Sequence, residues 1–135
     1  MTAVTFLHFY RETAIRLTQA KLSLAATATD GRPSGYGRNP LAPAEGLSAA
    51  ALSQAADFWQ AEVDTLSASI RRMEPQMHAL LTGIPSFPGR IAVYSYFGCG
   101  MSLPETAAAC DRSERQTWRL LREAVKAEAP VACGA

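Results

Sequence analysis

Apolar side chains recur at helical spacing along most of this chain, and the first such run covers about residues 3–28. Polar and charged residues such as Arg11, Arg16 and Lys21 fall between its members. The apolar positions alternate at spacings of four and three residues: Phe6, Tyr10, Thr13, Leu17, Ala20 and Leu24. This one-sided pattern predicts an amphipathic helix whose apolar face packs against the rest of the molecule.

A second run of apolar residues covers about 48–73 and repeats through three heptads. Its positions are Leu52, Ala56, Trp59, Val63, Leu66, Ile70 and Met73. Such a repeat is typical of the central packing helix of a small protein, or of a short coiled coil with a second copy. Because three heptads are barely enough for an independent coiled coil, we expect packing within the molecule. The alternative predicts weak self-association through the 48–73 helix.

Shorter elements are expected after this helix. Pro75 predicts the start of a further short helix through Leu81, because proline fits the first turn of a helix but not its interior. Pro85 and Pro88 predict a loop after that helix. An apolar and aromatic helix is then expected over about 89–97, where it would support the C-terminal part of the chain.

Between the first two predicted helices lies a segment, about 30–46, that is dense in Gly and Pro and cannot continue as helix. It must therefore form a long loop. This loop carries Arg32, Tyr36 and Arg38. Loops of this length are usually either functional or without fixed structure, so the segment is either a contact surface or a linker.

Two capping boxes predict a pair of short helices near the C-terminus. Ser102 with Glu105, and Ser113 with Gln116, each have the spacing at which a side chain and the backbone bond reciprocally at a helix start. The spacing of the two starts leaves a first helix over about 103–109, a tight turn at 110–112 and a second helix over about 114–128. The pattern predicts a helix-turn-helix.

The predicted turn has Asp111 where helix-turn-helix turns commonly have Gly. Asp tolerates the left-handed conformation better than most residues, so the turn can still form. Before it, Ala107, Ala108 and Ala109 are small enough to let the second helix approach closely.

Four cations share one face of the second helix. At roughly 100° per residue, Arg115, Arg119, Arg122 and Lys126 lie within a narrow arc. The opposite side carries an apolar stripe of Thr117, Leu120, Leu121, Ala124 and Val125. A helix of this kind suits the groove of a nucleic acid, although Glu114 and Glu123 also fit an ordinary solvated face. The predicted DNA-binding residues are Arg112, Ser113, Arg115, Gln116, Arg119, Arg122 and Lys126.

Composition narrows the class of protein. Alanine-rich stretches and few β-branched runs favour an all-α protein of 135 residues. The formal net charge is only +1, so affinity for nucleic acid must come from a local patch. No apolar run is long enough for a membrane span and no signal peptide is visible, so we expect a cytoplasmic protein.

Neither a metal site nor a catalytic site is predicted. Cys99, Cys110 and Cys133 include no close pair, and a buried free thiol is the expected state of each. Paired carboxylates occur only as Glu62 and Asp64, which point to different sides of a helix. No Ser, His and acid set and no phosphate-binding Gly loop is present, so we expect no enzyme activity and no cofactor.

The C-terminal blocks 90–97, 100–107 and 113–124 resemble the helix-turn-helix of phage late-gene antitermination proteins of the Q type. Related architecture occurs in the promoter-recognising C-terminal region of bacterial sigma factors. The resemblance implies a factor that binds double-stranded DNA beside a late promoter, loads onto the host bacterial RNA polymerase and suppresses termination. It also implies, from layout alone, that Arg32, Tyr36 and Arg38 face the polymerase.

These inferences divide the chain into an N-terminal helical region, 1–85 with its loop at 30–46, and a helix-turn-helix region, 86–135. The two regions are expected to form one compact unit. A phage small terminase subunit or a homodimeric helix-turn-helix regulator would also fit the pattern. Stoichiometry distinguishes the three classes, because a terminase forms a ring, a repressor forms a stable dimer and an antiterminator is monomeric or weakly associated before loading.

Overall fold

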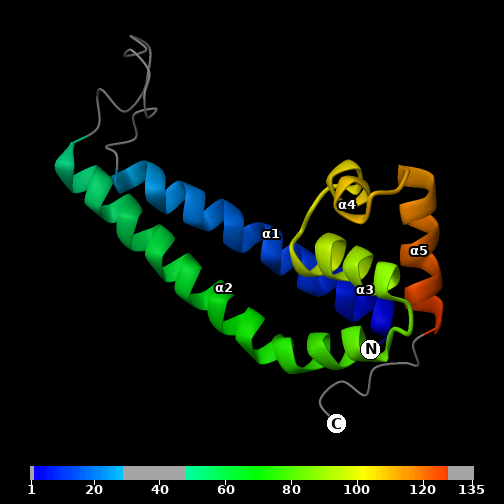
Figure 1. Ribbon diagram of the computed structural model, residues 1–135. Coiled ribbons are helices and arrows are strands. Elements are labelled where there is room, and N and C mark those ends of the chain that lie inside the picture. Colours follow the sequence, from blue (N-terminus) through cyan, green and yellow to red (C-terminus); the bar gives the residue numbers. More distant parts are fainter. Residues whose placement is uncertain (1, 29–47, 128–135) are drawn as a thin grey trace. The chain divides into compact units, whose positions relative to one another are not determined.

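The computed structural model describes residues 2–28 and 48–127, and this part of the chain is built from helices without any strand (Figure 1). The all-α prediction is therefore confirmed. In chain order the elements are α1 (Ala3–Ala28), α2 (Ala49–Gly83), α3 (Phe87–Val93), a π-helical turn η2 (Tyr94–Gly98), α4 (Leu103–Cys110) and α5 (Glu114–Ala127). The predicted loop over 30–46 lies outside the described residues.

The chain divides into two compact units, and each of the two long helices contributes to both. Unit 1 comprises Met1–Ile15 and Ser69–Ala135, and unit 2 comprises Arg16–Ala68. Unit 1 thus contains the start of α1 and the end of α2 together with all the shorter helices. The candidate site lies in unit 1.

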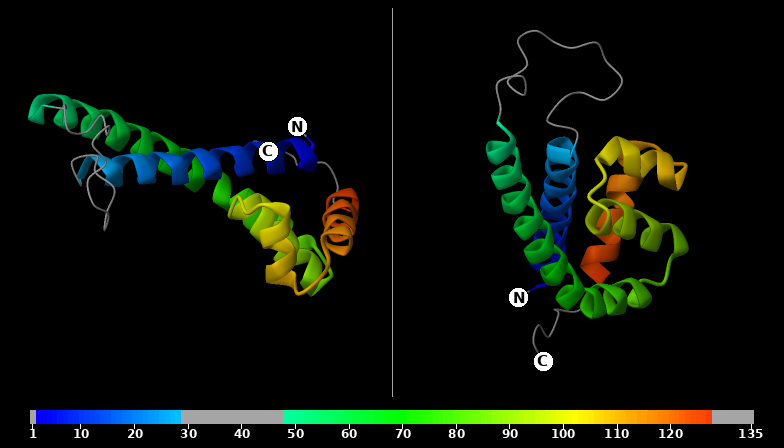
Figure 2. Two further views of the ribbon diagram at one scale, coloured as in Figure 1. Left: turned by 90° about the horizontal axis from the view of Figure 1, so that it is seen from above. Right: turned by 90° about the vertical axis from the view of Figure 1, so that its left-hand side faces the viewer.

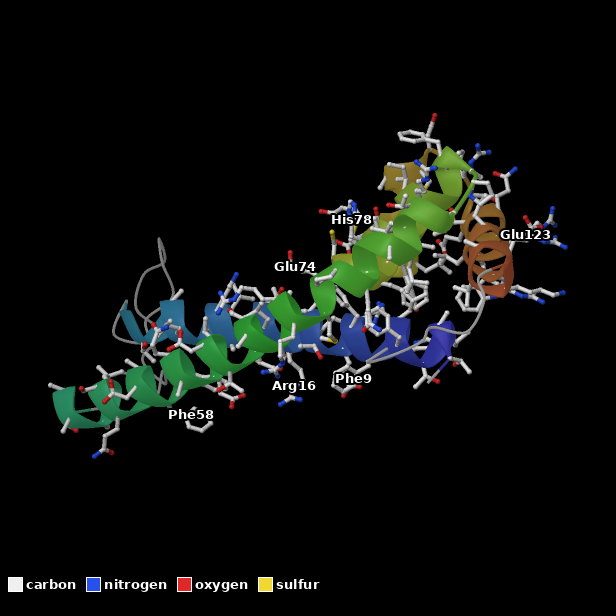
Figure 3. All side chains as sticks on the ribbon, turned by 90° about the horizontal axis from the view of Figure 1, so that it is seen from below. Phe9, Arg16, Phe58, Glu74, His78 and Glu123 are labelled. Atoms are coloured by element: carbon white, nitrogen blue, oxygen red, sulfur yellow. The ribbon has the colours of Figure 1, made fainter. Side chains whose placement is uncertain are left out.

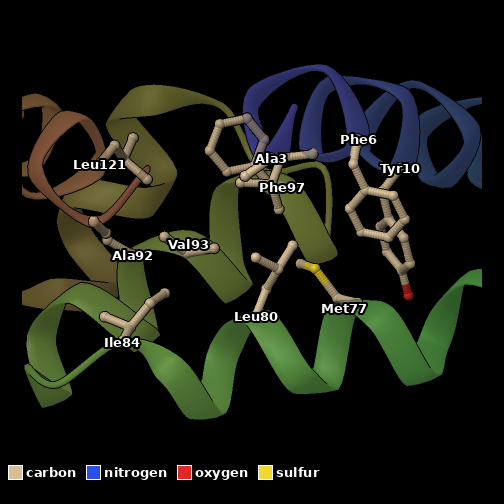
Figure 4. Close-up of a cluster of buried hydrophobic side chains, with 12 residues drawn as sticks. Ala3, Phe6, Tyr10, Met77, Leu80, Ile84, Ala92, Val93, Phe97 and Leu121 are labelled. Atoms are coloured by element: carbon tan, nitrogen blue, oxygen red, sulfur yellow. The ribbon is translucent and has the colours of Figure 1, made fainter. Parts of the chain in front are cut away.

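The core of unit 1 brings together segments from both ends of the chain (Figure 4). Its buried apolar side chains come from α1, from α2 and the residue after it, from α3 with η2, and from α5: Ala3, Phe6, Leu7, Tyr10, Met77, Leu80, Ile84, Ala92, Val93, Phe97, Leu121 and Ala124. Helix α5 packs against both α3 and α4. One face of α5 is therefore held by the core while the other is left to solvent.

Unit 2 is a pair of helical segments, 16–28 of α1 and 49–68 of α2, that run antiparallel and side by side (Figures 1 and 2). Ala20 and Leu66 are its buried apolar residues within the described ranges. Phe58 is 59% exposed and points away from the ribbon of α2 (Figure 3). The pair therefore has a thin core.

The predicted apolar faces of both long helices face inward. In α1, Phe6, Tyr10, Thr13 and Ala20 are buried. The predicted positions of α2 are buried at Leu66 and half-buried at the other six. The spacing of these positions is enough to predict which side is buried, because a 3.6-residue period places them on one side of the helix whatever that side packs against.

The predicted break at Pro75 is wrong, because α2 continues through this proline to Gly83. Proline inside a helix removes one backbone hydrogen bond and costs about 3 kcal/mol in isolation. The same face of α2 carries Met73, Met77 and Leu80, which join the core on both sides of the proline. Packing of this continuous apolar face offsets the local cost.

The helix expected over 89–97 begins earlier and changes its winding. The Ser86 side chain caps α3 by accepting a hydrogen bond from the Gly89 N–H at 3.0 Å, so that Pro88 lies in the first turn. From Tyr94 the chain forms the wider turn η2, closed by a hydrogen bond from the Cys99 N–H to the Tyr94 carbonyl at 2.9 Å.

Candidate nucleic-acid interface

Helix α4 begins at the capping box predicted from Ser102 and Glu105. The Ser102 N–H donates to the Glu105 carboxylate at 2.9 Å, and the Glu105 N–H donates to the Ser102 hydroxyl at 3.3 Å. The backbone hydrogen bond from Ser102 lowers the pKa of the Glu105 carboxyl. The backbone N–H groups of Ser102 and Glu105 are therefore both satisfied by side chains three residues away, as the sequence spacing predicts.

Helix α4 ends at Asp111, which has the left-handed conformation with φ 54° and ψ 47°. The Asp111 N–H bonds to the Ala108 carbonyl at 3.2 Å, and the Arg112 N–H reaches back to the Ala107 carbonyl at 3.1 Å. This pair of bonds is a Schellman motif with Asp in the place that Gly usually occupies. The turn is thus tight enough for α5 to begin at Glu114.

Helix α5 begins at the second predicted capping box. The Ser113 N–H donates to the Gln116 side-chain oxygen at 3.1 Å, and the Gln116 N–H donates to the Ser113 hydroxyl at 3.1 Å. Two of the predicted DNA-binding residues therefore hold each other in place. Their side chains have a structural role in this chain before any ligand is considered.

Helices α4 and α5 pack against each other, and two threonines and one alanine of this pair are buried. Thr106 and Thr117 are fully buried, and each hydroxyl donates at 2.8 Å to the carbonyl four residues earlier, that of Ser102 or Ser113. Ala107 is also buried. Of the three alanines predicted to let α5 approach closely, only Ala107 is buried, and Ala108 and Ala109 lie on the exposed side of α4.

The predicted division of α5 into two faces is confirmed. Thr117, Leu121 and Ala124 are buried, and Leu120 and Val125 are half-buried. All four cations of the opposite arc are exposed: Arg115, Arg119, Arg122 and Lys126. Of the other predicted DNA-binding residues, Arg112, Ser113 and Gln116 are also exposed, at the turn and the first turn of α5. Glu123 projects outward from the same helix (Figure 3).

An arginine from α1 holds the segment that leads into α4. The Arg11 guanidinium donates to the Met101 carbonyl at 3.0 Å and lies 4.1 Å from the centre of the Tyr96 ring. Nearby, Gly100 has φ 72° and passes close to Ile15 of α1. These contacts position the start of α4, and sequence spacing could not indicate them because Arg11 and Met101 lie 90 residues apart.

Beside the cationic face, α5 forms one wall of an open groove of about 700 Å³. The start of α1 forms the other wall and η2 contributes to the floor. The lining residues are Val4, His8, Phe97, Trp118, Arg119, Leu121, Arg122, Glu123, Val125 and Lys126. The prediction from sequence missed this groove, although Trp118 is an aromatic residue next to the cationic arc.

Several predicted features fall elsewhere. Arg32, Tyr36 and Arg38 lie outside the described residues, as does Cys133. Cys99 is a free thiol but is exposed at the end of η2, so the expectation that it is buried is wrong. Cys110 is a half-buried free thiol, and burial raises its pKa while Arg112 opposes the shift.

The described residues thus form a helical protein with a cation-bearing helix beside a groove. In the described ranges, no helix is long and apolar enough to cross a membrane, and no three His, Cys, Asp or Glu side chains gather as metal ligands would. Comparisons of the chain with protein-family models, curated proteins and solved structures gave no match.

Proposed function

We propose that α4 and α5 act as a DNA-binding helix-turn-helix in a phage transcription antitermination factor of the Q type. The observation that carries the DNA-binding part is the face of α5 that holds Arg115, Arg119, Arg122 and Lys126 in solvent while the opposite face is buried. A helix presented in this way can enter the major groove and contact phosphates on either side.

The residues divide by their place on α5. Arg115 and Arg119 lie in its first half, where recognition helices contact base edges, and Arg122 and Lys126 lie further back, where phosphates are nearer. The Gln116 oxygen is engaged in the capping box, so its amide NH₂ is the group left to meet DNA. We assign base reading mainly to the two arginines of the first half.

The antitermination part of the proposal comes from the sequence resemblance. In this proposal the protein acts in the bacterial cytoplasm, binds DNA beside a late promoter and then travels with RNA polymerase. The loop residues Arg32, Tyr36 and Arg38 face the polymerase in this proposal. No cofactor or metal takes part.

The DNA-binding proposal is tested with duplexes selected from a random pool by the wild-type protein. Arg119→Ala should weaken binding to the selected duplex about 5- to 150-fold and relax its sequence preference, as for the loss of a base contact of about 1–3 kcal/mol. Lys126→Ala should weaken selected and random duplexes equally and reduce the salt dependence. Arg71→Ala, at an exposed position of α2, is the control. Gel shifts compare the wild type with these three variants and with the Arg115→Ala/Arg119→Ala double variant. Wild-type affinity in the double variant would refute the interface.

The antitermination proposal needs a separate readout. Single-round transcription with purified bacterial polymerase, on a template that carries the selected site and a terminator, should show read-through when the protein is added. A ring or a tight dimer by light scattering, without read-through, would instead support the terminase or the repressor. DNA binding could survive that outcome, so the two parts of the proposal fail independently.

A further inference from the structure

The groove between α1 and α5 shares Arg119, Arg122 and Lys126 with the proposed DNA-binding face, but the DNA-binding proposal does not require its apolar lining. Its apolar residues come from three elements that the chain brings together only on folding: Val4 of α1, Phe97 of η2, and Trp118, Leu121 and Val125 of α5. Val4 and Trp118 leave 43% and 46% of their surfaces exposed. Single exposed apolar side chains are normal on a protein surface, whereas an apolar strip built from several residues indicates a binding site.

The size of the groove fits one secondary-structure element. Its α5 wall runs from Trp118 to Lys126, which is about 12 Å or two helical turns at 1.5 Å per residue. On the α1 wall, Val4 and His8 are one turn apart. Two helix walls over an apolar floor form the kind of groove that receives the apolar face of an amphipathic helix.

The charge of the groove specifies the partner. Arg119, Arg122 and Lys126 lie along its rim, and Glu123 is the one acidic residue among its lining residues. His8, which also lines the groove, is exposed and makes an edge-on contact with the Phe97 ring, with ring centres 5.3 Å apart. A partner with acidic side chains beside its apolar anchors would pair with these cations, whereas a basic partner would be repelled.

We infer that this groove binds an acidic amphipathic helix of a protein partner. The anchors of that helix, at i, i+3 or i+4 and i+7, lie against Trp118, Val125 and Val4, and its flanking carboxylates pair with Arg122 and Lys126. The inference goes beyond the proposed DNA contact. It requires neither the loop at 30–46 nor the antitermination activity.

The probe is a fluorescein-labelled 16-residue helical peptide with leucines at the anchor positions and glutamates on the flanks. Two matched peptides replace either the glutamates by lysine or the leucines by serine. Fluorescence anisotropy with the full-length protein should show saturable binding of the first peptide. Each matched peptide should bind at least about tenfold more weakly, as expected for the loss of two ion pairs or of the buried anchors.

Variants of the protein locate the binding site. Trp118→Ala should weaken the acidic peptide about tenfold, and Arg122→Glu/Lys126→Glu should shift the preference toward the lysine peptide. Val4→Asp places a negative charge on the α1 wall, which repels the glutamates of the acidic peptide and should also weaken its binding. This exposed position keeps the test valid if Trp118→Ala does not fold, as judged by circular dichroism. Phe87→Ala, at a residue 69% exposed and outside the groove lining, should bind like wild type.

Equal binding of the glutamate and lysine peptides would overturn the inference, and so would an unchanged affinity in the folded groove variants. Absence of peptide binding, together with loss of duplex DNA affinity in Trp118→Ala, would assign the groove to the DNA interface instead. The gel shifts on Arg119→Ala and the peptide titrations on Val4→Asp change different residues. Failure of one proposal can therefore be distinguished from failure of the other.

Discussion

Two residues in the described part of the chain have a positive φ, and each lies at one end of α4. Asp111 ends the helix in a conformation that its short polar side chain tolerates. Gly100, two residues before the Ser102 cap, has φ 72°, and a Cβ added there would lie 2.8 Å from Cγ1 of Ile15. Both the backbone conformation and the close approach of α1 therefore require glycine at position 100.

At the residue scale we predict that Gly100→Ala lowers the free energy of unfolding by about 2–4 kcal/mol. Left-handed strain accounts for about 1–2 kcal/mol of this loss, and overlap with Ile15 accounts for the rest. Urea unfolding followed by circular dichroism measures the change.

Gly98→Ala is the matched control for this prediction. Its φ lies outside the left-handed region, and its added Cβ would meet the flexible end of Met77 at 3.3 Å. The helix preference of alanine opposes the crowding, so the change should stay within about 1 kcal/mol. Equal losses at positions 98 and 100 would show that crowding, and not backbone conformation, determines stability in this segment.

At the scale of elements, α2 shows a local preference overruled by packing. Pro75 is exposed, so its ring does not contribute to the core that Met73 and Met77 join on either side. Its effect on stability is therefore mainly the missing backbone hydrogen bond and the contact of its ring with the preceding turn. The helix tolerates this cost because its apolar face is continuous.

We predict that Pro75→Ala raises the free energy of unfolding by about 1–2 kcal/mol. The gain from the restored hydrogen bond and the relieved ring contact exceeds the loss of about 1 kcal/mol from the less restricted unfolded chain. Pro85→Ala, in the connection between α2 and α3, should instead be neutral or destabilising by up to about 1 kcal/mol. Chemical denaturation of both variants gives the comparison. A marked loss of stability in Pro75→Ala would mean that the proline directs how α2 packs in unit 1.

At the scale of the whole molecule, the buried apolar residues are divided unevenly. Within the described ranges Ala20 and Leu66 are the two that belong to unit 2, and all the others belong to unit 1. Each long helix thus passes from a well-filled core into a segment with few buried contacts. Local opening is easier where less apolar surface is buried.

We predict that backbone amides of residues 16–27 exchange with deuterium faster than those of residues 6–15 in the same helix. The same contrast is expected in α2, with faster exchange over 49–68 than over 69–83, because the two ranges of each helix belong to different units. Mass spectrometry of peptides after timed exchange provides the measurement. Comparison within one helix removes differences in helix type, and uniform protection along α1 and α2 would show that the units open together.

Local rules determined much of this protein from sequence alone. The inward faces of α1, α2 and α5 follow from a 3.6-residue period, and the starts of α4 and α5 follow from hydrogen bonds that span three residues at Ser102 and Ser113. The same period determined that the cations of α5 would lie opposite its buried stripe. These features need no knowledge of distant parts of the chain.

Tertiary structure decided the features that depend on distant segments. Helix α2 continues through Pro75 because its apolar face finds partners in α1 and α3, and no local signal carries that information. Likewise, Val4 and Trp118 line one groove although 114 positions separate them in the sequence. Periodicity shows which side of a helix is buried, but which helices meet, and what cavity remains between them, depends on how their side chains pack in three dimensions.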